Sequence, residues 1–273
     1  MKRSDRVFLF LLLLTCFFTQ MTFAGNRKDS SLTNSKVHFP PWFYKVEGLV
    51  KSAEKGDPKA QCALGFAYEK GRELPENRRK AIKWYKKSAD QGFAKAQYRL
   101  AYLCRFGKGR PQDYDEAIRL YELAAEQGFA KAQYSLGSMY HFGEGVAQDY
   151  SKALNWYKKS ADRGNIYAQR CLGMLYESGK EEEISQDYEE SFRWYKRAAE
   201  QGDYLSQFYL GRMYEEGKGV PQDLEQAYIW CFLSGDEKYC SLLAKQIPSY
   251  RAFKLRGIAK NMKKNIFKDE EKL

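Results

Sequence analysis

The sequence predicts an all-α protein, an α-solenoid of about five helix-turn-helix repeats with a C-terminal capping helix. Two observations predict it: a motif returns about every 36 residues, and the apolar residues within each unit follow helical spacing. The motif opens with the pairs Ala60-Gln61, Ala96-Gln97, Ala132-Gln133, Ala168-Gln169 and, in altered form, Ser206-Gln207. One helical pair cannot bury its own apolar face, so stacked neighbours must share a continuous core.

The first helix of each unit has a defined start and one apolar side. In the first unit, Asp57 offers a capping acceptor, and Pro58 takes the first helical position, where no N–H is needed. Ala60, Leu64 and Tyr68 then follow the i, i+4, i+8 spacing of a buried stripe. Equivalent residues return in the later units, which predicts the same helix in each.

The second helix of each unit begins at an Asn or Asp that can cap it and ends before a glycine. The capping slot holds Asn77, Asp113, Asp149, Asp187 and Asp223. The terminal glycines are Gly92, Gly128, Gly164 and Gly202. Between these ends, small residues such as Ala81 let helices approach closely, while Trp84, Tyr85 and their equivalents fill the layer between units.

The combined motif resembles the Sel-1-like repeat, a relative of the tetratricopeptide repeat (TPR), and residues 132–164 match its pattern nearly in full. Departures are local, such as Ala101 and Cys104, which replace Gly and Tyr in the second unit. The resemblance implies a right-handed superhelix that serves as an adaptor for protein complexes. Several bacterial members of the family are exported and act at the cell envelope or the host interface.

The repeats set the expected limits of the domains. A half repeat at 46–59 opens a repeat region that ends at 244, and a basic C-terminal helix occupies 245–273. The five full repeats are expected at 60–95, 96–131, 132–167, 168–205 and 206–240.

The N-terminus has the layout of a secretory signal peptide. Basic residues at the start precede an apolar run that begins at Val7, and small residues precede a cut between Ala24 and Gly25. We expect a signal peptide over 1–24, a linker over 25–45, and an exported chain that is periplasmic or secreted. An uncleaved N-terminal anchor is the alternative.

Five cysteines remain after residue 24, an odd number, and none forms a CxxC motif. Cys231 and Cys240 flank Gly235 at a turn between helices, and an oxidising compartment would permit a disulfide between them. The chain has two histidines, His38 and His141, too far apart in sequence to suggest a histidine-rich metal site. We expect no metal, no cofactor and no catalytic residue.

Three patterns look like catalytic or ligand-binding motifs. Gly-x-Gly at 107–109, 143–145 and 217–219 lies between helices, which favours hairpin turns over phosphate loops. Ser52 and Lys55 match the SxxK of penicillin-recognising enzymes, but the chain lacks the SDN and KTG partners. His141 shares its repeat slot with charged residues, which predicts an exposed position. An alternative function is that of a β-lactam-recognising or cell-envelope-binding protein, like the cysteine-rich relatives of the repeat family.

The variable side of the first helices carries candidate residues for partner binding. In related helical-hairpin solenoids the first helices line the concave surface, where aromatic and Arg side chains could anchor a protein or peptide. The candidates are Phe66, Tyr98, Tyr102, Phe106, Tyr134, Phe142, Arg170, Met174, Phe208 and Arg212. The alternative is that several of them only pack between adjacent helices.

Charge is unevenly distributed along the chain, whose net charge is +11. Residues 46–112 hold 16 basic and 7 acidic side chains, whereas 113–244 hold 14 and 23. We expect no nucleic-acid partner for an exported chain; an anionic membrane or cell-wall surface could meet its basic C-terminal helix. That helix has an apolar stripe, which suits an end cap or a helix lying on a membrane. The stripe is Leu255, Ile258, Met262 and Ile266.

Overall fold

The computed structural model of the protein describes residues 41–71, 73–180 and 183–268, and for 41–45 and 267–268 it describes the backbone alone. The predicted signal peptide and residues 25–40 of the predicted linker lie outside the described residues. Helix α2 (Pro41–Glu54) takes in residues 41–45, which the sequence assigns to the linker. No helix in the described ranges combines the length and apolar character needed to cross a membrane.

The all-α prediction is confirmed: the described residues form thirteen helices, most of them paired as helix-turn-helix repeats. The first helices of the repeats are α3 (Pro58–Lys70), α5 (Ala94–Arg105), α7 (Ala130–Phe142), α9 (Ile166–Ser178) and α11 (Tyr204–Glu216). The second helices are α4 (Arg78–Asp90), α6 (Tyr114–Glu126), α8 (Tyr150–Ala161), α10 (Tyr188–Glu200) and α12 (Leu224–Ser234). The C-terminal helices are α13 (Glu237–Ala244) and α14 (Ser249–Lys268).

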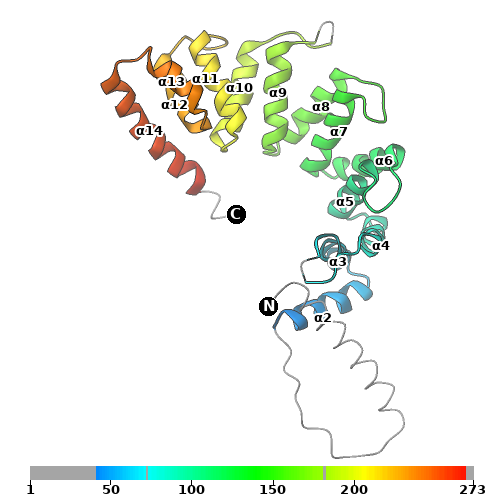
Figure 1. Cartoon of the computed structure of the whole chain (residues 1–273). Coiled ribbons are helices and arrows are strands. Elements are labelled where there is room, and N and C mark those ends of the chain that lie inside the picture. The colour runs from blue at the N-terminus through cyan, green and yellow to red at the C-terminus, as the bar shows by residue number, and fades with distance from the viewer. Residues whose placement is uncertain (1–40, 72, 181–182, 269–273) are drawn as a thin grey trace, which may run out of the picture. The chain divides into compact units, whose positions relative to one another are not determined.

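The helices fall into two compact units, the first ending at Asp113 and the second starting at Tyr114. In the first unit α2 packs on α3, and α3 on α4 (Figure 1). In the second unit α7 to α12 pack as successive neighbours, each helix against the next (Figure 1). Each unit therefore stacks helical hairpins.

The recurring glutamine links each hairpin to the helix before it. In all five repeats its side-chain amide donates a hydrogen bond to the carbonyl oxygen eight residues earlier, near the end of the preceding helix. Gln207 bonds Ala199 in this way at 3.0 Å, and its side chain is buried. Each of these carbonyl oxygens also accepts a hydrogen bond from the backbone N–H of the glycine three residues later. The glutamine therefore adds a second hydrogen bond at the helix end and ties it to the next hairpin.

A buried tyrosine in the second helix fills the space between the helices of a repeat. The tyrosines at this slot are all fully buried and are Tyr85, Tyr121, Tyr157 and Tyr195. The ring of Tyr195 lies so close to Gly173 that a Cβ atom there would stand 2.6 Å from it. The recurring glycine of the first helix is thus explained by close approach.

Four of the five predicted second-helix caps, and the predicted turns, are confirmed. The Asp187 side chain accepts a 2.9 Å hydrogen bond from the Glu190 N–H, and Asn77, Asp149 and Asp223 cap their helices in the same way. In the turn between α7 and α8, Gly143 and Gly145 have positive φ, and a Cβ on Gly145 would meet the Tyr114 side chain at 2.4 Å. These glycines form a hairpin turn, not a phosphate loop.

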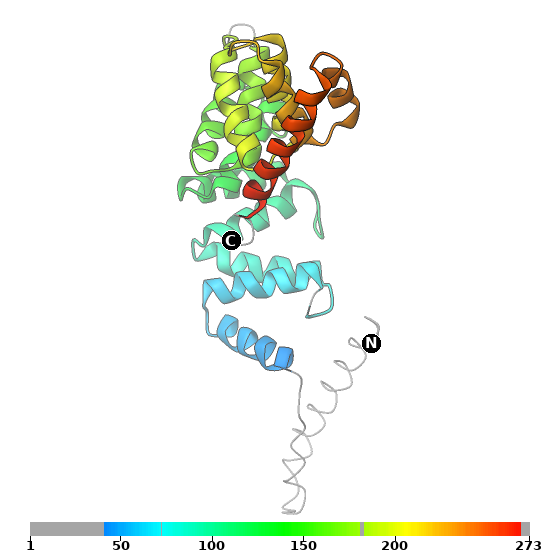
Figure 2. The same cartoon turned by 90° about the vertical axis from the view of Figure 1, so that its left-hand side faces the viewer.

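Helix α14 caps the second unit by packing against α12 (Figure 2). Its buried residues are Ala252, Leu255 and Ala259, and Met262 packs beside them. The predicted stripe is wrong at Ile258, which is 41% exposed. The reason is the phase of the helix: contacts at 252, 255, 259 and 262 leave residue 258 on the flank of the buried side.

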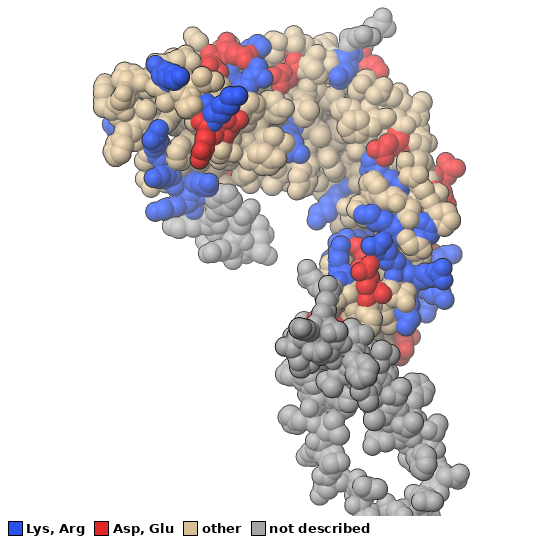
Figure 3. All heavy atoms as spheres, viewed as in Figure 1, with Lys and Arg blue, Asp and Glu red and all other residues tan. Residues whose placement is uncertain are grey.

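Basic side chains gather in two places. Figure 3 shows Lys and Arg over the helices of the first unit, with some acidic groups among them, and along α14. The first unit owes much of this charge to α4, with Arg79, Lys83 and Lys86 exposed.

Candidate partner-binding surface

The ten predicted partner-binding residues all lie on first helices or at their ends, and none is fully buried. Three are exposed: Phe106 at 46%, Phe142 at 64% and Met174 at 43%. The other seven are half-buried. The three exposed residues are therefore accessible to a partner, whereas the seven half-buried residues also pack against neighbouring helices.

In the first unit, the candidates Phe66, Tyr102 and Phe106 lie under cationic groups, and Tyr98 is half-buried on α5. The rings of Tyr102 and Phe106 are 4.7 Å apart, and Lys108 donates a 2.7 Å hydrogen bond to the Tyr102 hydroxyl while lying over both rings. The Arg99 guanidinium lies 4.9 Å from the centre of the Phe66 ring. Such cation–π contacts restrain the rings and give this surface a positive charge.

In the second unit, four candidates are engaged within the protein. Arg170 forms a 2.6 Å ion pair with Asp203, whose side chain is buried, and Arg212 pairs with Glu216 at 2.7 Å. The remaining two contact other aromatic rings. Tyr134 contacts rings on α8 and α9, and Phe208 contacts its neighbour on α11 and a ring on α13.

The exposed candidates of the second unit lie beside a hollow of about 290 Å³ between the first helices of repeats three, four and five. Its lining is chemically mixed, with a thioether, two phenol rings, an imidazole, a carboxylate and an ammonium group. The lining residues are His141, Met174, Leu175, Glu177, Ser178, Lys180, Tyr195 and Tyr209. We call these eight residues the repeat hollow. Met174 is the one sequence-predicted candidate among them.

Two residues that line the repeat hollow, Tyr195 and Glu177, are joined by a part-buried hydrogen bond. The Tyr195 hydroxyl donates to the Glu177 carboxylate at 2.8 Å, and the Tyr195 ring stacks on Tyr209 with 5.0 Å between ring centres. Burial and the Glu177 carboxylate raise the pKa of Tyr195, which keeps its hydroxyl protonated as a donor. The carboxylate is thus held at the rim by a rigid partner.

His141 differs from its predicted position. It is half-buried in the repeat hollow, where its ring stacks on Phe142 at 4.5 Å and meets Tyr150 edge-on at 5.4 Å. Among the described residues its buried Nδ1 has no hydrogen-bond partner. Burial, and secondarily Lys180, lower the pKa of His141, so the neutral imidazole is favoured. The slot is half-buried here because aromatic rings of repeat three cover it.

The family model described as Sel1 repeat matches five consecutive segments of the chain. They are residues 58–93, 94–129, 130–165, 166–203 and 205–237. The chain belongs to the Sel1 repeat family. The four earlier Sel1 repeats start two residues before the limits predicted from the Ala-Gln pairs, at or next to the first residue of each first helix.

Solved Sel1 repeat structures are similar to this chain. A Sel1 repeat protein from Oxalobacter formigenes shares 33% identity at a TM-score of 0.65, over 70% of this chain and 78% of that one. The protein c5321, a protective antigen of uropathogenic Escherichia coli with an SLR fold, shares 28% identity at a TM-score of 0.72. That likeness covers 97% of this chain, which spans 55% of the antigen. No curated protein matches the chain.

The Sel1 repeats also explain which residues of the hollow could be found from sequence. Glu177 shares its slot with Glu69, which accepts a 2.7 Å hydrogen bond from Tyr85. The recurrence of Glu opposite Tyr is visible in the sequence and signals this pair. Lys180 and Tyr209 have no such recurrence, because the turn after α9 and the Tyr209 slot vary between repeats.

The serine of the SxxK match and the paired cysteines each contact residues near them in the sequence. Ser52 donates its hydroxyl to Asp57 at 3.2 Å, beside the cap of α3. Cys231 and Cys240 are both free thiols, and the hydrogen bond between them raises the pKa of Cys231 and lowers that of Cys240. The predicted disulfide thus has its two sulfurs adjacent and stays a prediction. Across the described ranges, no three His, Cys, Asp or Glu side chains are grouped to hold a metal ion.

Proposed function

We propose that this Sel1 repeat protein is an exported, non-catalytic scaffold that binds a protein or peptide at the repeat hollow of its second unit. The observation that carries the proposal is the hollow itself, with Phe142 and Met174 exposed beside it. An apolar side chain of the partner would enter between these two residues.

The chemistry of the repeat hollow supports a peptide ligand. Met174 has a flexible thioether that adapts to differently shaped apolar groups. Glu177 and Lys180 offer charges of both signs at the rim. Apolar anchors ringed by a few fixed polar groups are the usual composition of a recognition site.

Export is supported by two observations. The first 24 residues have the basic, apolar and small-residue order of a signal peptide. The uropathogenic E. coli relative is a protective antigen, which agrees with an exported role for the present chain. Processing at Gly25 is tested by N-terminal sequencing of the protein from cell fractions, and a chain that keeps Met1 in the cytoplasm would contradict export.

The binding proposal is tested with a peptide selected from a displayed random library on the purified protein. Its affinity is then measured by fluorescence anisotropy for Phe142→Ala, Met174→Ala and the control Tyr204→Ala. Tyr204 is 60% exposed but starts α11, at the end opposite the hollow. We expect a loss of about tenfold or more for the first two variants and none for the control. Equal affinity of all four proteins would refute the site.

A further inference from the structure

Helix α14 has an outer face that its capping role leaves unused. Its inner residues pack into the core of the second unit, whereas Tyr250 is 73% and Phe253 80% exposed. A single exposed apolar side chain is ordinary, but these two rings lie one turn apart on the same side of a helix. They form an exposed aromatic pair at the start of α14.

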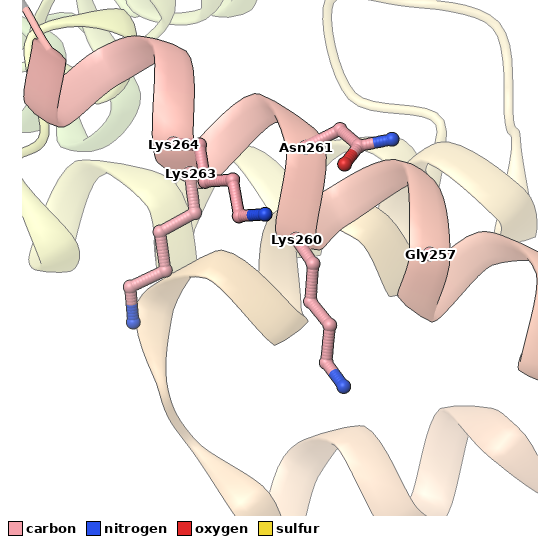
Figure 4. Close-up of a pocket in the computed structure, with 5 residues that line it drawn as sticks. All are labelled: Gly257, Lys260, Asn261, Lys263 and Lys264. Atoms are coloured by element: carbon pink, nitrogen blue, oxygen red, sulfur yellow. The ribbon is translucent and has the colours of Figure 1, made fainter.

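Lysines follow toward the end of α14, with Lys260 and Lys264 in line with Phe253 and Lys263 exposed on the flank of the same face. Lys260, Lys263 and Lys264 lie within about one turn and project from one stretch of the helix (Figure 4). Among the residues that the structure describes, none of the three forms an ion pair. By contrast, Arg251 pairs with Glu225 at 2.6 Å and Arg256 bonds the Tyr228 hydroxyl at 2.6 Å, so the arginines fasten the helix to the unit.

We propose that the outer face of α14, defined as Tyr250, Phe253, Lys260, Lys263 and Lys264, docks the second unit on an anionic lipid surface. Aromatic rings insert at the boundary of headgroups and acyl chains, and lysines bury their stems while their ammonium groups meet phosphates. From Tyr250 to Lys264 the helix rises about 20 Å along its axis, enough to contact several lipids.

The shape of the face favours a membrane over an acidic protein. In the described chain the hollow beside the lysines is lined by α14 alone, so no second element forms a wall that would grip a peptide (Figure 4). An open strip with rings at one end and unpaired cations at the other is complementary to a broad negative surface. This inference does not depend on the repeat hollow, which lies on other helices.

Vesicle flotation of the purified protein tests the inference. The vesicles are phosphatidylcholine alone, or phosphatidylcholine with about 30% phosphatidylglycerol. One variant combines Lys260→Gln, Lys263→Gln and Lys264→Gln, and a second combines Tyr250→Ser and Phe253→Ser. The control combines Lys83→Gln, Lys86→Gln and Lys87→Gln on α4, which removes the same charge from another exposed helix.

We expect the wild-type protein to float with anionic but not neutral vesicles. Each α14 variant should lower the bound fraction by about fivefold or more, with the α4 control unchanged. Circular dichroism and the melting temperature confirm that each variant is folded. The proposal is overturned if the wild type stays unbound, if the α14 variants bind normally, or if the α4 control loses as much binding. Capture by polyglutamate without flotation would assign the face to an acidic protein instead.

Discussion

The hydroxyl of Tyr195 donates a 2.8 Å hydrogen bond to the carboxylate of Glu177, joining the middle of α10 to the last turn of α9. Tyr85 and Glu69 repeat the bond in the first repeat at 2.7 Å. In the fifth repeat Cys231 replaces the tyrosine, and Tyr239 of the next helix donates to Glu215 instead. A buried hydroxyl needs such an acceptor, so the bond stabilises the hairpin and places a carboxylate at the rim of the repeat hollow.

Removing this acceptor should destabilise the second unit. Glu177→Ala leaves the buried Tyr195 hydroxyl without its acceptor, and we expect the free energy of unfolding to fall by about 1–3 kcal/mol. The free energy of unfolding is measured by urea denaturation, with circular dichroism as the signal. Glu200→Ala is the control, because Glu200 is exposed at the end of α10 and forms no ion pair in the described chain. Equal stability of the two variants would contradict the role of the pair.

The glycine beneath Tyr195 should not tolerate a methyl group. In Gly173→Ala the new Cβ would lie 2.6 Å from the buried ring, so we expect a loss of about 1–3 kcal/mol from overpacking. Gly257→Ala on α14 meets nothing within 4 Å and should gain about 0.5–1 kcal/mol, because alanine favours a helix. The melting temperature should therefore fall for Gly173→Ala and rise for Gly257→Ala. Shifts of the same sign would contradict the close approach of Tyr195 to Gly173.

The stability of the protein should decrease in mild acid because of His141. Its pKa in the folded protein lies below the ordinary value of 6.5, so the unfolded chain binds a proton first as the pH falls. The stabilisation is complete above pH 6.5 and is lost as the pH falls through the lower, folded pKa. In His141→Gln the difference in melting temperature between about pH 7.5 and pH 5.5 should shrink. An unchanged difference would show that the imidazole is not desolvated.

The five cysteine thiols after residue 24 should react at different rates. Cys240 has a lowered pKa because of its hydrogen bond with Cys231, whereas burial raises the pKa values of Cys62 and Cys171. Under reducing conditions iodoacetamide should therefore label Cys240 first, because the thiolate is the nucleophile. In oxidised protein neither Cys231 nor Cys240 should react until a reductant is added. Peptide mapping that finds both thiols free after oxidation would exclude the predicted disulfide.

The fold could be predicted from sequence because its determinants recur. Helix caps such as Asp187, the Ala-Gln pair and the glycines depend on neighbours within one or two helices, and five copies make the pattern visible. Which residues share the repeat hollow could not be predicted, because it combines side chains of α7, α9, α10, α11 and the turn after α9. Ile258 is a second example. The spacing of apolar residues predicted a buried Ile258, but the buried position is the neighbouring Ala259.

Methyl NMR of methionine-labelled protein tests binding at the repeat hollow most directly. Met174 lines the hollow, whereas Met262 packs in the cap formed by α14. Adding the library-selected peptide should shift the Met174 methyl resonance, assigned with Met174→Leu, and leave that of Met262 unchanged. A peptide that binds while the Met174 resonance stays in place would contradict the site.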